Sequence, residues 1–239
     1  MRTKADAWLA VANLFKAQLA TELEGSYSEE GITFFAVDPS GVSMVAATIA
    51  PTAFTPYTQG TENFRIGLDF VLDSFKPGTE PDISIQDGKF TIRLGRSVRS
   101  KRLDTVLETP IRYPRIEFTA SCLVTSADLK AITGEKIFSG LGTETEPGVR
   151  ITIDAEGVTF SGATAVEEFS AGADGASEGA GHTWISPSYL AAIVKSIAKG
   201  EIVKIELTDS APIKLGIDGT DYTASIYIAP QVPVGDDDE

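Results

Sequence analysis

The side chains best suited to catalysis do not form a recognisable catalytic set. The single histidine, His182, lies in a glycine-rich stretch with no second histidine and no cysteine nearby, so the sequence shows no metal-ligand spacing. A Ser-His-Asp set is compatible with the spacing, but the G-x-S-x-G match at Gly175–Gly179 lies in a low-complexity stretch and not at the strand-to-helix turn that such a nucleophile requires. The acid pairs Glu29-Glu30 and Glu167-Glu168 are more typical of solvated strand edges than of general acids. We therefore predict a protein that is not an enzyme and that binds no metal.

Nucleotide and redox chemistry also lack support. The chain has neither G-x-x-x-x-G-K nor G-x-G-x-x-G, the loops that hold phosphate groups, so we expect no cofactor. Cys122 is the one cysteine, and its apolar surroundings favour a small buried residue over a nucleophile. One cysteine allows no internal disulfide, which fits a reducing compartment. With no signal sequence and no run of about 18 apolar residues, we expect an intracellular protein of the cytoplasm or nucleoid, with no membrane partner.

The overall charge argues at first sight against nucleic-acid binding. The 239-residue chain has a net charge of −14 at pH 7, whereas contact with phosphates requires lysine and arginine. Net charge does not decide the question, because a ring or a groove can be basic on one face only. The 42% of hydrophobic residues suffice for one large domain or for two domains of about 120 residues each.

One stretch, Gly31–Val45, is central to the predicted fold. Its apolar and β-branched residues predict a strand, a turn at Asp38-Pro39-Ser40-Gly41 and a second strand. An aspartate can bond its own backbone, a proline fixes φ and a glycine tolerates positive φ, so this sequence favours a turn. The segment Glu30-Gly31-Ile32-Thr33-Phe34 recurs about half a chain later as Glu156-Gly157-Val158-Thr159-Phe160. We therefore predict two copies of one folding unit.

Apolar residues at helical spacing predict four helices, with Ser186 as the N-cap of the last and Pro187 at its first position. These helices are Ala5–Leu19, Leu68–Phe75, Ser126–Ile132 and Ser186–Ala198. Alternating and β-branched segments predict strands in the first half at Leu23–Ser28, Gly31–Val37, Val42–Ile49, Phe64–Gly67, Asp82–Gln86, Lys89–Leu94 and Val98–Val106. In the second half the predicted strands are Ile116–Val124, Val149–Asp154, Val158–Gly162, Ala165–Ser170, Val203–Leu207, Ile213–Ile217 and Thr223–Ile228.

The fold class that follows is α+β, with two similar domains that each combine helices with antiparallel sheet. We place the N-terminal domain at residues 1–107 and the C-terminal domain at 116–233. The segment 108–115 carries two prolines and no periodicity, which is typical of a linker. The low-complexity stretch Gly172–Gly181 is expected to be a mobile loop, and the acidic tail 234–239 to be disordered.

Several short segments, in a fixed order over nearly the whole chain, resemble one known family. They are Ala36-Val37-Asp38-Pro39-Ser40 with Val42 and Met44, Ile66-Gly67-Leu68, Ile116–Ala120, Ala211–Leu215 and Tyr227–Pro230. Together they resemble the DNA sliding clamps of the proliferating cell nuclear antigen (PCNA) family, most of all the archaeal or archaeal-virus branch. That family usually opens with a strand before the first helix. Only Met1–Lys4 is available here, so this strand is either very short or missing.

The resemblance implies the DNA clamp fold, assembled as a closed homotrimeric ring whose helices line the hole. Double-stranded DNA passes through the hole without sequence-specific contact. The clamp tethers DNA polymerase and other replication and repair enzymes as a processivity factor, and a separate clamp loader opens it. The positions that match the family's DNA-facing cations are Lys16, Lys76 and Lys195, with Lys130 and Lys199 as further candidates. The alternative interpretation is that these are ordinary solvated lysines.

Partners of such clamps carry a short motif of a glutamine, an aliphatic residue and two aromatic residues, which docks beneath the linker. By match with the family, the pocket here consists of Gly41, Val42, Met44, Leu107, Ile111, Ala211, Pro212, Ile228, Ala229 and Pro230. An apolar anchor would enter this pocket while the peptide backbone pairs with the C-terminal strand. The alternative is that Val42, Met44 and Ile228 belong to the core.

The densest basic run, Arg93–Arg102, could bind nucleic acid by composition, but the family pattern places it on the edge strand that pairs with the next subunit. We therefore expect a subunit interface in which Arg99, Lys101 and Arg102 face Glu167 and Glu168 of the neighbouring chain. Unpartnered exposed charge is the alternative.

Two other functions of the same fold stay open. One is a monomeric processivity factor held on DNA by charge, which would need a broader basic face than these lysines supply. The other is one subunit of a heterotrimeric clamp. A small hydrolase on an α+β fold is the least favoured.

Overall fold

The computed structural model describes residues 1–58, 60, 63–104, 114–143 and 147–232. Among these, no helix is both long and apolar enough to cross a membrane. The chain divides into two compact units. One is Met1–Tyr113 with Asp218–Ala224, and the other is Pro114–Ile217 with Ser225–Glu239. Most of the predicted linker, residues 108–113, and the tail from residue 233 lie outside the described residues.

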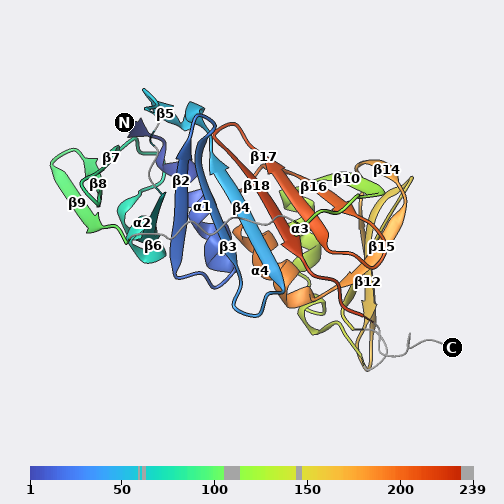
Figure 1. The fold of residues 1–239 in the computed structure, drawn as a ribbon. Helices are drawn as coiled ribbons and strands as arrows, with labels where there is room; N and C mark the ends of the chain where they lie inside the picture. The colour runs from blue at the N-terminus through green and yellow to red at the C-terminus, as the bar shows by residue number, and fades with distance from the viewer. Residues whose placement is uncertain (59, 61–62, 105–113, 144–146, 233–239) are drawn as a thin grey trace. The chain divides into compact units, whose positions relative to one another are not determined.

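In the part of it that the structure describes, the first unit holds two α-helices and strands of two antiparallel sheets (Figure 1). The helices are α1 (Ala5–Ala17) and α2 (Leu68–Ser74). One sheet has the order β6-β2-β3-β4 and consists of β2 (Glu22–Ser28), β3 (Gly31–Val37), β4 (Ser43–Ile49) and β6 (Asn63–Gly67). The other has the order β5-β1-β7-β8-β9 and consists of β1 (Arg2–Thr3), β5 (Phe54–Thr55), β7 (Asp82–Gln86), β8 (Lys89–Leu94) and β9 (Ser97–Arg102).

The second unit contains the same kinds of helices and sheets as the first. Its helices are α3 (Ser126–Thr133) and α4 (Pro187–Ser196). One sheet has the order β15-β11-β12-β13 and consists of β11 (Val149–Asp154), β12 (Gly157–Ala163), β13 (Glu168–Ala173) and β15 (Gly181–Ile185). The other has the order β14-β10-β16-β17-β18 and consists of β10 (Ala120–Thr125), β14 (Ala176–Gly179), β16 (Ile202–Leu207), β17 (Ile213–Asp218) and β18 (Tyr222–Ile228). The last residue of β17 and the first three of β18 are grouped with the first unit.

The strand orders confirm the predicted two-copy architecture. The sheet β6-β2-β3-β4 corresponds to β15-β11-β12-β13, and β1-β7-β8-β9 corresponds to β10-β16-β17-β18. The recurring segment begins β3 at Gly31 and β12 at Gly157, where φ is +124° and +133°. A Cβ at Gly31 would lie 2.1 Å from the carbonyl oxygen of Ile49, and one at Gly157 would lie 2.7 Å from that of Ala173. Glycine is thus required at the same hairpin position in both copies.

Helix α1 forms where its apolar spacing predicts, but it ends at Ala17, and Leu19 at the predicted end is 73% exposed. The buried residues of α1 anchor the first unit. Trp8, Val11 and Phe15 are each at most 1% exposed, and α1 packs against α2 and β4. The Trp8 ring meets the rings of Phe34 and Phe90 edge-on, with centroids 5.6 and 5.4 Å apart. The family's opening strand exists but is only two residues long, since β1 pairs with β5 and β7.

The predicted turn between β3 and β4 is confirmed in detail. The carboxylate of Asp38 is buried and accepts hydrogen bonds from the backbone N–H of Ser43 at 2.6 Å and of Ser40 at 3.1 Å. The backbone N–H of Gly41 donates to the carbonyl oxygen of Asp38 at 2.9 Å, and φ of Gly41 is +71°. Asp38 therefore accepts backbone hydrogen bonds within the turn, and Gly41 adopts the positive φ, as their residue types predict.

Three strand predictions have boundaries that are wrong by three residues or more. The strand expected at Val98–Val106 is β9, which ends at Arg102; residues 105 and 106 lie outside the described residues. The strand expected at Ile116–Val124 begins only at Ala120, because Ala120 pairs with Leu207 at the end of β16 and the earlier residues pass beyond that strand. The strand expected at Ala165–Ser170 is β13, Glu168–Ala173. The residues before it form a turn, in which the hydroxyl of Thr164 accepts the backbone N–H of Glu167 at 3.0 Å.

The expectation of a mobile loop at Gly172–Gly181 is wrong. This stretch contains the end of β13, all of β14 and the first residue of β15, and His182 lies inside β15. Its glycines permit close strand pairing: a Cβ at Gly175 would lie 2.1 Å from the carbonyl oxygen of Leu123, and one at Gly179 would lie 2.0 Å from that of Thr119. The glycines therefore let β14 approach β10.

Candidate functional site

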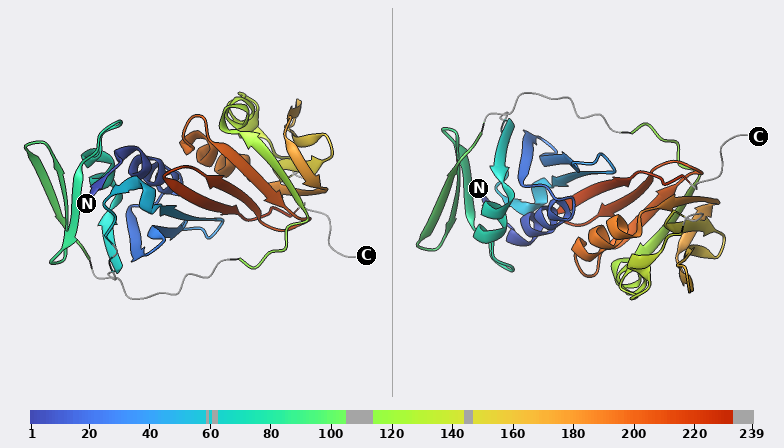
Figure 2. Two further views of the ribbon diagram at one scale, coloured as in Figure 1. Left: turned by 90° about the horizontal axis from the view of Figure 1, so that it is seen from above. Right: turned by 90° about the horizontal axis from the view of Figure 1, so that it is seen from below.

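The predicted DNA-facing lysines of the first unit lie near opposite ends of α1. Lys16 is exposed in the last turn of α1, and Lys76 is exposed just after α2. The two helices lie side by side (Figure 2). The carboxylate of Asp6 in the first turn of α1 accepts the backbone N–H of Gly78 at 2.9 Å. This bond fixes the turn that carries Lys76 against the start of α1.

Of the three predicted DNA-facing lysines of the second unit, Lys195 and Lys199 are exposed and Lys130 is hydrogen-bonded. Lys195 is exposed in the last turn of α4, and Lys199 is exposed shortly after that helix. Lys130 is different, because its ammonium donates a hydrogen bond to the carbonyl oxygen of Ile197, 2.5 Å away, just after the end of α4. Lys130 thus joins α3 to the C-terminal end of α4, where a cation also complements the helix dipole.

Acidic side chains accompany these lysines. Asp69 and Asp73 are exposed on α2. Glu22 lies at the start of β2, where a carboxylate oxygen is 3.6 Å from Nε of Arg65. The acidic side chains therefore weaken the attraction of these surfaces for phosphates, and salt independently screens that attraction beyond about 10 Å at 0.1 M ionic strength.

The predicted partner-pocket residues of the first unit follow the Asp38 turn. Gly41 is exposed, Val42 is half-buried and Met44 is 8% exposed. The turn contacts of Asp38 hold Gly41 and Val42 between β3 and β4. Leu107 and Ile111, which the prediction took from the linker, lie outside the described residues.

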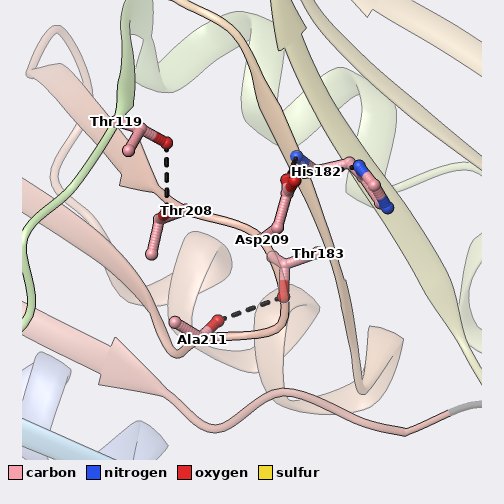
Figure 3. Close-up of polar contacts among 6 residues, drawn as sticks. All are labelled: Thr119, His182, Thr183, Thr208, Asp209 and Ala211. Atoms are coloured by element: carbon pink, nitrogen blue, oxygen red, sulfur yellow. Dashed lines mark hydrogen bonds and ion pairs between the residues drawn. The ribbon is translucent and has the colours of Figure 1, made fainter.

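The pocket residues of the second unit lie in two segments. Ala229 and Pro230 follow β18 and are half-buried, whereas Ile228 is 0% exposed and packs in the core. Ala211 and Pro212, also half-buried, lie in the loop between β16 and β17. Polar contacts to β15 and to the segment just before β10 hold this loop, as Figure 3 shows.

The loop 208–212 has four polar contacts to its surroundings (Figure 3). One oxygen, Oδ1 of Asp209, accepts the backbone N–H of His182 at 2.8 Å and lies 3.3 Å from Nδ1 of the same residue. The hydroxyl of Thr183 donates to the carbonyl oxygen of Ala211 at 3.1 Å, and the hydroxyl of Thr119 donates to that of Thr208 at 3.0 Å. The loop that bears Ala211 is thus fastened to β15 and to the chain before β10.

The predicted subunit surfaces are edge strands. β9 ends the sheet of the first unit and β13 ends the four-stranded sheet of the second. Directly opposed residues share a sheet face, so Arg99 beside Ile92 and Lys101 beside Phe90 lie on the core side of β9. Arg99 there lies 5.3 Å from the ring centroid of Phe70 in α2.

Arg102 and Glu168 lie on the face of these two edge strands that is turned away from the core. Arg102 is exposed on β9, opposite Lys89 and away from the core. Glu168 is exposed on β13, next to Phe169, whose ring packs on that of Phe138 on the core side. Glu167 lies in the turn before β13 and not in the strand.

Residues considered for catalysis form no catalytic constellation in the described part of the chain. His182 and Asp209 are partners, but the nearby hydroxyls of Thr119 and Thr183 are bonded to Thr208 and Ala211. Cys122 is 0% exposed, and burial raises the pKa of its thiol. No group of three or more His, Cys, Asp or Glu among the described residues could hold a metal ion.

Sequence reasoning missed a cavity on the sheet β15-β11-β12-β13. It has a volume of about 590 Å³, and Trp184, Arg150, Ser161 and Ser170 line it in cross-strand register. Nε of Arg150 is buried without a hydrogen bond. Arg150 lies between the buried Val149 and Ile151, as in any strand with alternating polar and apolar residues. The sequence therefore does not indicate that Arg150 lines a cavity.

Comparison with known proteins points to one family. No protein-family model matches the chain. The curated DNA polymerase sliding clamp of Pyrococcus horikoshii is 26% identical over 223 residues, which span 83% of this chain and 84% of the relative. The sliding clamp of Thermococcus onnurineus is also 26% identical, over 90% of this chain and 91% of the relative.

Solved structures agree in fold. The chain is similar to the A. fulgidus PCNA bound to the C-terminal region of FEN-1, with a TM-score of 0.84, 19% identity and coverage of 97% and 98% of the two chains. It is also similar to a chain of the PCNA2–PCNA3 complex of Sulfolobus tokodaii, with a TM-score of 0.79, 18% identity and coverage of 97% and 99%. With its duplicated units and its two curated archaeal relatives, the chain is similar in sequence to archaeal DNA polymerase sliding clamps and has the fold of the PCNA structures.

Proposed function

We propose that this chain is a DNA sliding clamp that encircles duplex DNA and tethers a DNA polymerase to its template. The observation that carries this proposal is the agreement of a duplicated α+β architecture with sliding-clamp relatives over more than four-fifths of the chain. A clamp needs no active site, because it raises processivity by keeping the polymerase near the primer end. Primer extension on a circular template, with and without the clamp and its loader, tests the proposal. Longer products only with both would support it, and equal product lengths would overturn it.

We propose a homotrimer as the working assembly. Support comes from β9 and β13, two edge strands that would otherwise expose unpaired backbone groups. Pairing β9 of one copy with β13 of the next is a head-to-tail contact that can close into a ring. Arg102 and Glu168 both lie on the face of their strands away from the core, so we expect them to form an ion pair across this contact. Glu167→Lys with Glu168→Lys should leave monomers in light scattering, and an intact trimer would refute this interface.

DNA contact is proposed for Lys16, Lys76, Lys195 and Lys199, which are exposed on or just after their helices. Lys130 contributes less, since its ammonium is already bonded to the carbonyl oxygen of Ile197. Replacing Lys16 and Lys195 together by Gln should weaken retention on linear duplex DNA at low salt. Lys204→Gln is a matched control, because Lys204 lies on β16 and pairs with Glu206. Equal losses in both variants would mean that the helical lysines have no special role.

Partner docking is proposed at Gly41, Val42, Ala211, Pro212, Ala229 and Pro230, with Met44 and Ile228 supporting them from within the core. Similarity to a PCNA solved with the C-terminal region of FEN-1 supports a role in holding replication enzymes. The expected ligand is a peptide with a glutamine, an aliphatic residue and two aromatic residues. Such a peptide should bind with micromolar affinity or better, at about −8 kcal/mol. A control peptide with both aromatics replaced by alanine should not bind.

A heterotrimeric clamp is the second candidate. The similarity to a chain of the Sulfolobus tokodaii PCNA2–PCNA3 complex favours it specifically. In that case the purified chain would stay monomeric or dimeric alone and would reach ring mass only with other clamp subunits. The mass of the isolated chain therefore separates the two assemblies.

A further inference from the structure

We infer that Asp209 is a positioning residue for partner docking: it fixes the loop 208–212 so that Ala211 and Pro212 are held in place for the incoming peptide. The inference rests on the proposed function, because it assigns a role within the proposed partner pocket. It concerns contacts inside one unit, from β15 to the loop between β16 and β17.

Asp209 holds the loop through a single carboxylate oxygen. Oδ1 accepts the backbone N–H of His182 at 2.8 Å and lies 3.3 Å from Nδ1 of the imidazole. Asp209 is itself exposed, so the folded core does not need its side chain. A hydrogen bond to an ionised acceptor is stronger than one between neutral groups. The contact is therefore well suited to set where the loop lies while contributing little to global stability.

A second bond reaches the pocket residue itself. Thr183 is 1% exposed, and its hydroxyl donates to the carbonyl oxygen of Ala211 at 3.1 Å. A buried hydroxyl needs a partner, so this bond satisfies Thr183 and at the same time fixes the backbone of Ala211. His182 and Thr183, which are neighbours on β15, thus hold the loop at Asp209 and at Ala211, two residues apart.

The loop backbone shows why such support is needed. Ser210, between the two held residues, has φ of +56°, a conformation that residues other than glycine seldom adopt. Such a residue persists when its surroundings determine its conformation. The turn is closed by the backbone N–H of Ala211, which donates to the carbonyl oxygen of Thr208 at 3.3 Å. Without the Asp209 contact, this strained turn loses one of its two anchors on β15.

Gly181 leaves room for the carboxylate. A Cβ at Gly181 would lie 3.3 Å from Oδ1 of Asp209 and 3.0 Å from Cδ1 of Leu207. A methyl group at position 181 would therefore be too close to Leu207 and to the carboxylate of Asp209 unless these side chains moved. The absence of a side chain on β15, next to the residue that donates to Asp209, lets the loop approach the strand closely.

The consequence for binding is preorganisation. A loop that already has its bound conformation loses little entropy when a peptide docks. Because Ala211 and Pro212 form part of the proposed pocket, release of the loop should weaken peptide binding without changing the fold. Asp209→Ala removes both contacts of the carboxylate, whereas Asp209→Asn keeps an oxygen that can accept the backbone N–H of His182.

The test measures affinity for a fluorescent peptide that carries the glutamine-aliphatic-aromatic-aromatic motif. We expect Asp209→Ala to bind about tenfold more weakly than the unchanged chain, and Asp209→Asn to recover to within about threefold. Asp174→Ala, an exposed carboxylate between β13 and β14, is the matched control and should bind as the unchanged chain does. Hydrogen exchange at the amides of Ser210 and Ala211 should become faster in Asp209→Ala only, with solution mass and unfolding midpoint unchanged.

The outcomes are distinguishable. If the unchanged chain does not bind the peptide, the proposed pocket and this inference both fail. If it binds, but Asp209→Ala binds equally well, only the inference is overturned. If Asp209→Ala loses affinity together with a large drop in its unfolding midpoint, the residue is structural and the positioning role is refuted. A further variant, Thr183→Ser, keeps the hydroxyl bond to Ala211 and should retain affinity.

Discussion

The indole ring of Trp8 stacks on the phenyl ring of Phe75, with centroids 5.0 Å apart and the planes inclined by 9°. Trp8 belongs to α1 and Phe75 directly follows α2, so this contact joins the two helices of the first unit. The Trp8 Nε1–H is satisfied by the hydroxyl of Thr3 at 3.0 Å. A single side chain thus links α1, the end of α2 and the short strand β1.

Trp8→Ala should therefore destabilise the first unit by about 3–5 kcal/mol, because it removes a fully buried aromatic residue and leaves a cavity. Urea unfolding followed by circular dichroism measures this loss. Trp184→Ala is the control: its half-buried side chain lies on a sheet face, and its loss should cost about 1 kcal/mol. Equal costs for both variants would show that the Trp8 cluster is not the centre of this core.

Asp38→Ala should cost about 1–3 kcal/mol, because the buried backbone N–H of Ser43 then loses its acceptor. Asp38→Asn keeps one side-chain oxygen as an acceptor and should lose less. Thermal unfolding of the three proteins under one condition gives the comparison. An alanine variant as stable as the unchanged chain would mean that Gly41 and Pro39 alone form the turn.

Glu206 should stabilise the second unit in a pH-dependent way. Partial burial alone would raise the pKa of Glu206, but hydrogen bonds and charge from Lys214 at 2.7 Å and Lys204 at 2.9 Å outweigh burial and lower it. A lowered pKa adds stability above the carboxyl's unfolded-state pKa, and this stability is lost as the pH falls through the folded-state pKa.

At pH 7, Glu206→Gln should therefore be less stable than the unchanged chain by about 1 kcal/mol, and the difference should shrink in acid. Urea unfolding across the acid range measures the two curves. Glu156→Gln, an exposed carboxylate in the turn between β11 and β12, is the control and should show no such trend. A constant difference at every pH would contradict the role given to the two lysines.

Cys122 should react with thiol reagents only when the second unit opens. Burial raises the pKa of its thiol, so less of the reactive thiolate forms in the folded chain at a given pH. The stability linked to this shift is present below the unfolded-state pKa and is lost as the pH rises through the folded-state pKa. Native labelling should be at least about tenfold slower than labelling in denaturant. Equal rates would show that Cys122 is accessible.

The fold could be predicted well where local chemistry and core pattern agree. β3 at Gly31–Val37, β7 at Asp82–Gln86, β8 at Lys89–Leu94 and β11 at Val149–Asp154 have the predicted bounds. In these strands the apolar alternation, the flanking turn residues and the burial all favour the same structure. The repeated glycine of the β3 and β12 hairpins was also visible in the sequence, because no other residue type suits its backbone.

The sequence-based predictions failed where tertiary packing outweighs the local preference of the residues. β14 consists of Ala, Ser, Glu and Gly, which have low strand propensity, yet it pairs with β10 because small residues allow close approach. β15 escaped prediction because its start merges with that glycine-rich stretch. The Asp209 contact joins residues 27 positions apart, and no spacing rule brings such pairs together. Sequence located Ala211 and Pro212 by resemblance, but it could not show what holds them.

The central claim is tested most directly by the solution mass of the purified chain, measured by size-exclusion chromatography with light scattering at low and high salt. The account predicts a mass near three times 25.3 kDa at low salt, with partial dissociation as salt screens the ion pairs between edge strands. A mass of one chain at every salt and protein concentration would contradict the self-closing ring. A monomeric mass would instead favour one subunit of a heterotrimeric clamp or a monomeric processivity factor held on DNA by charge.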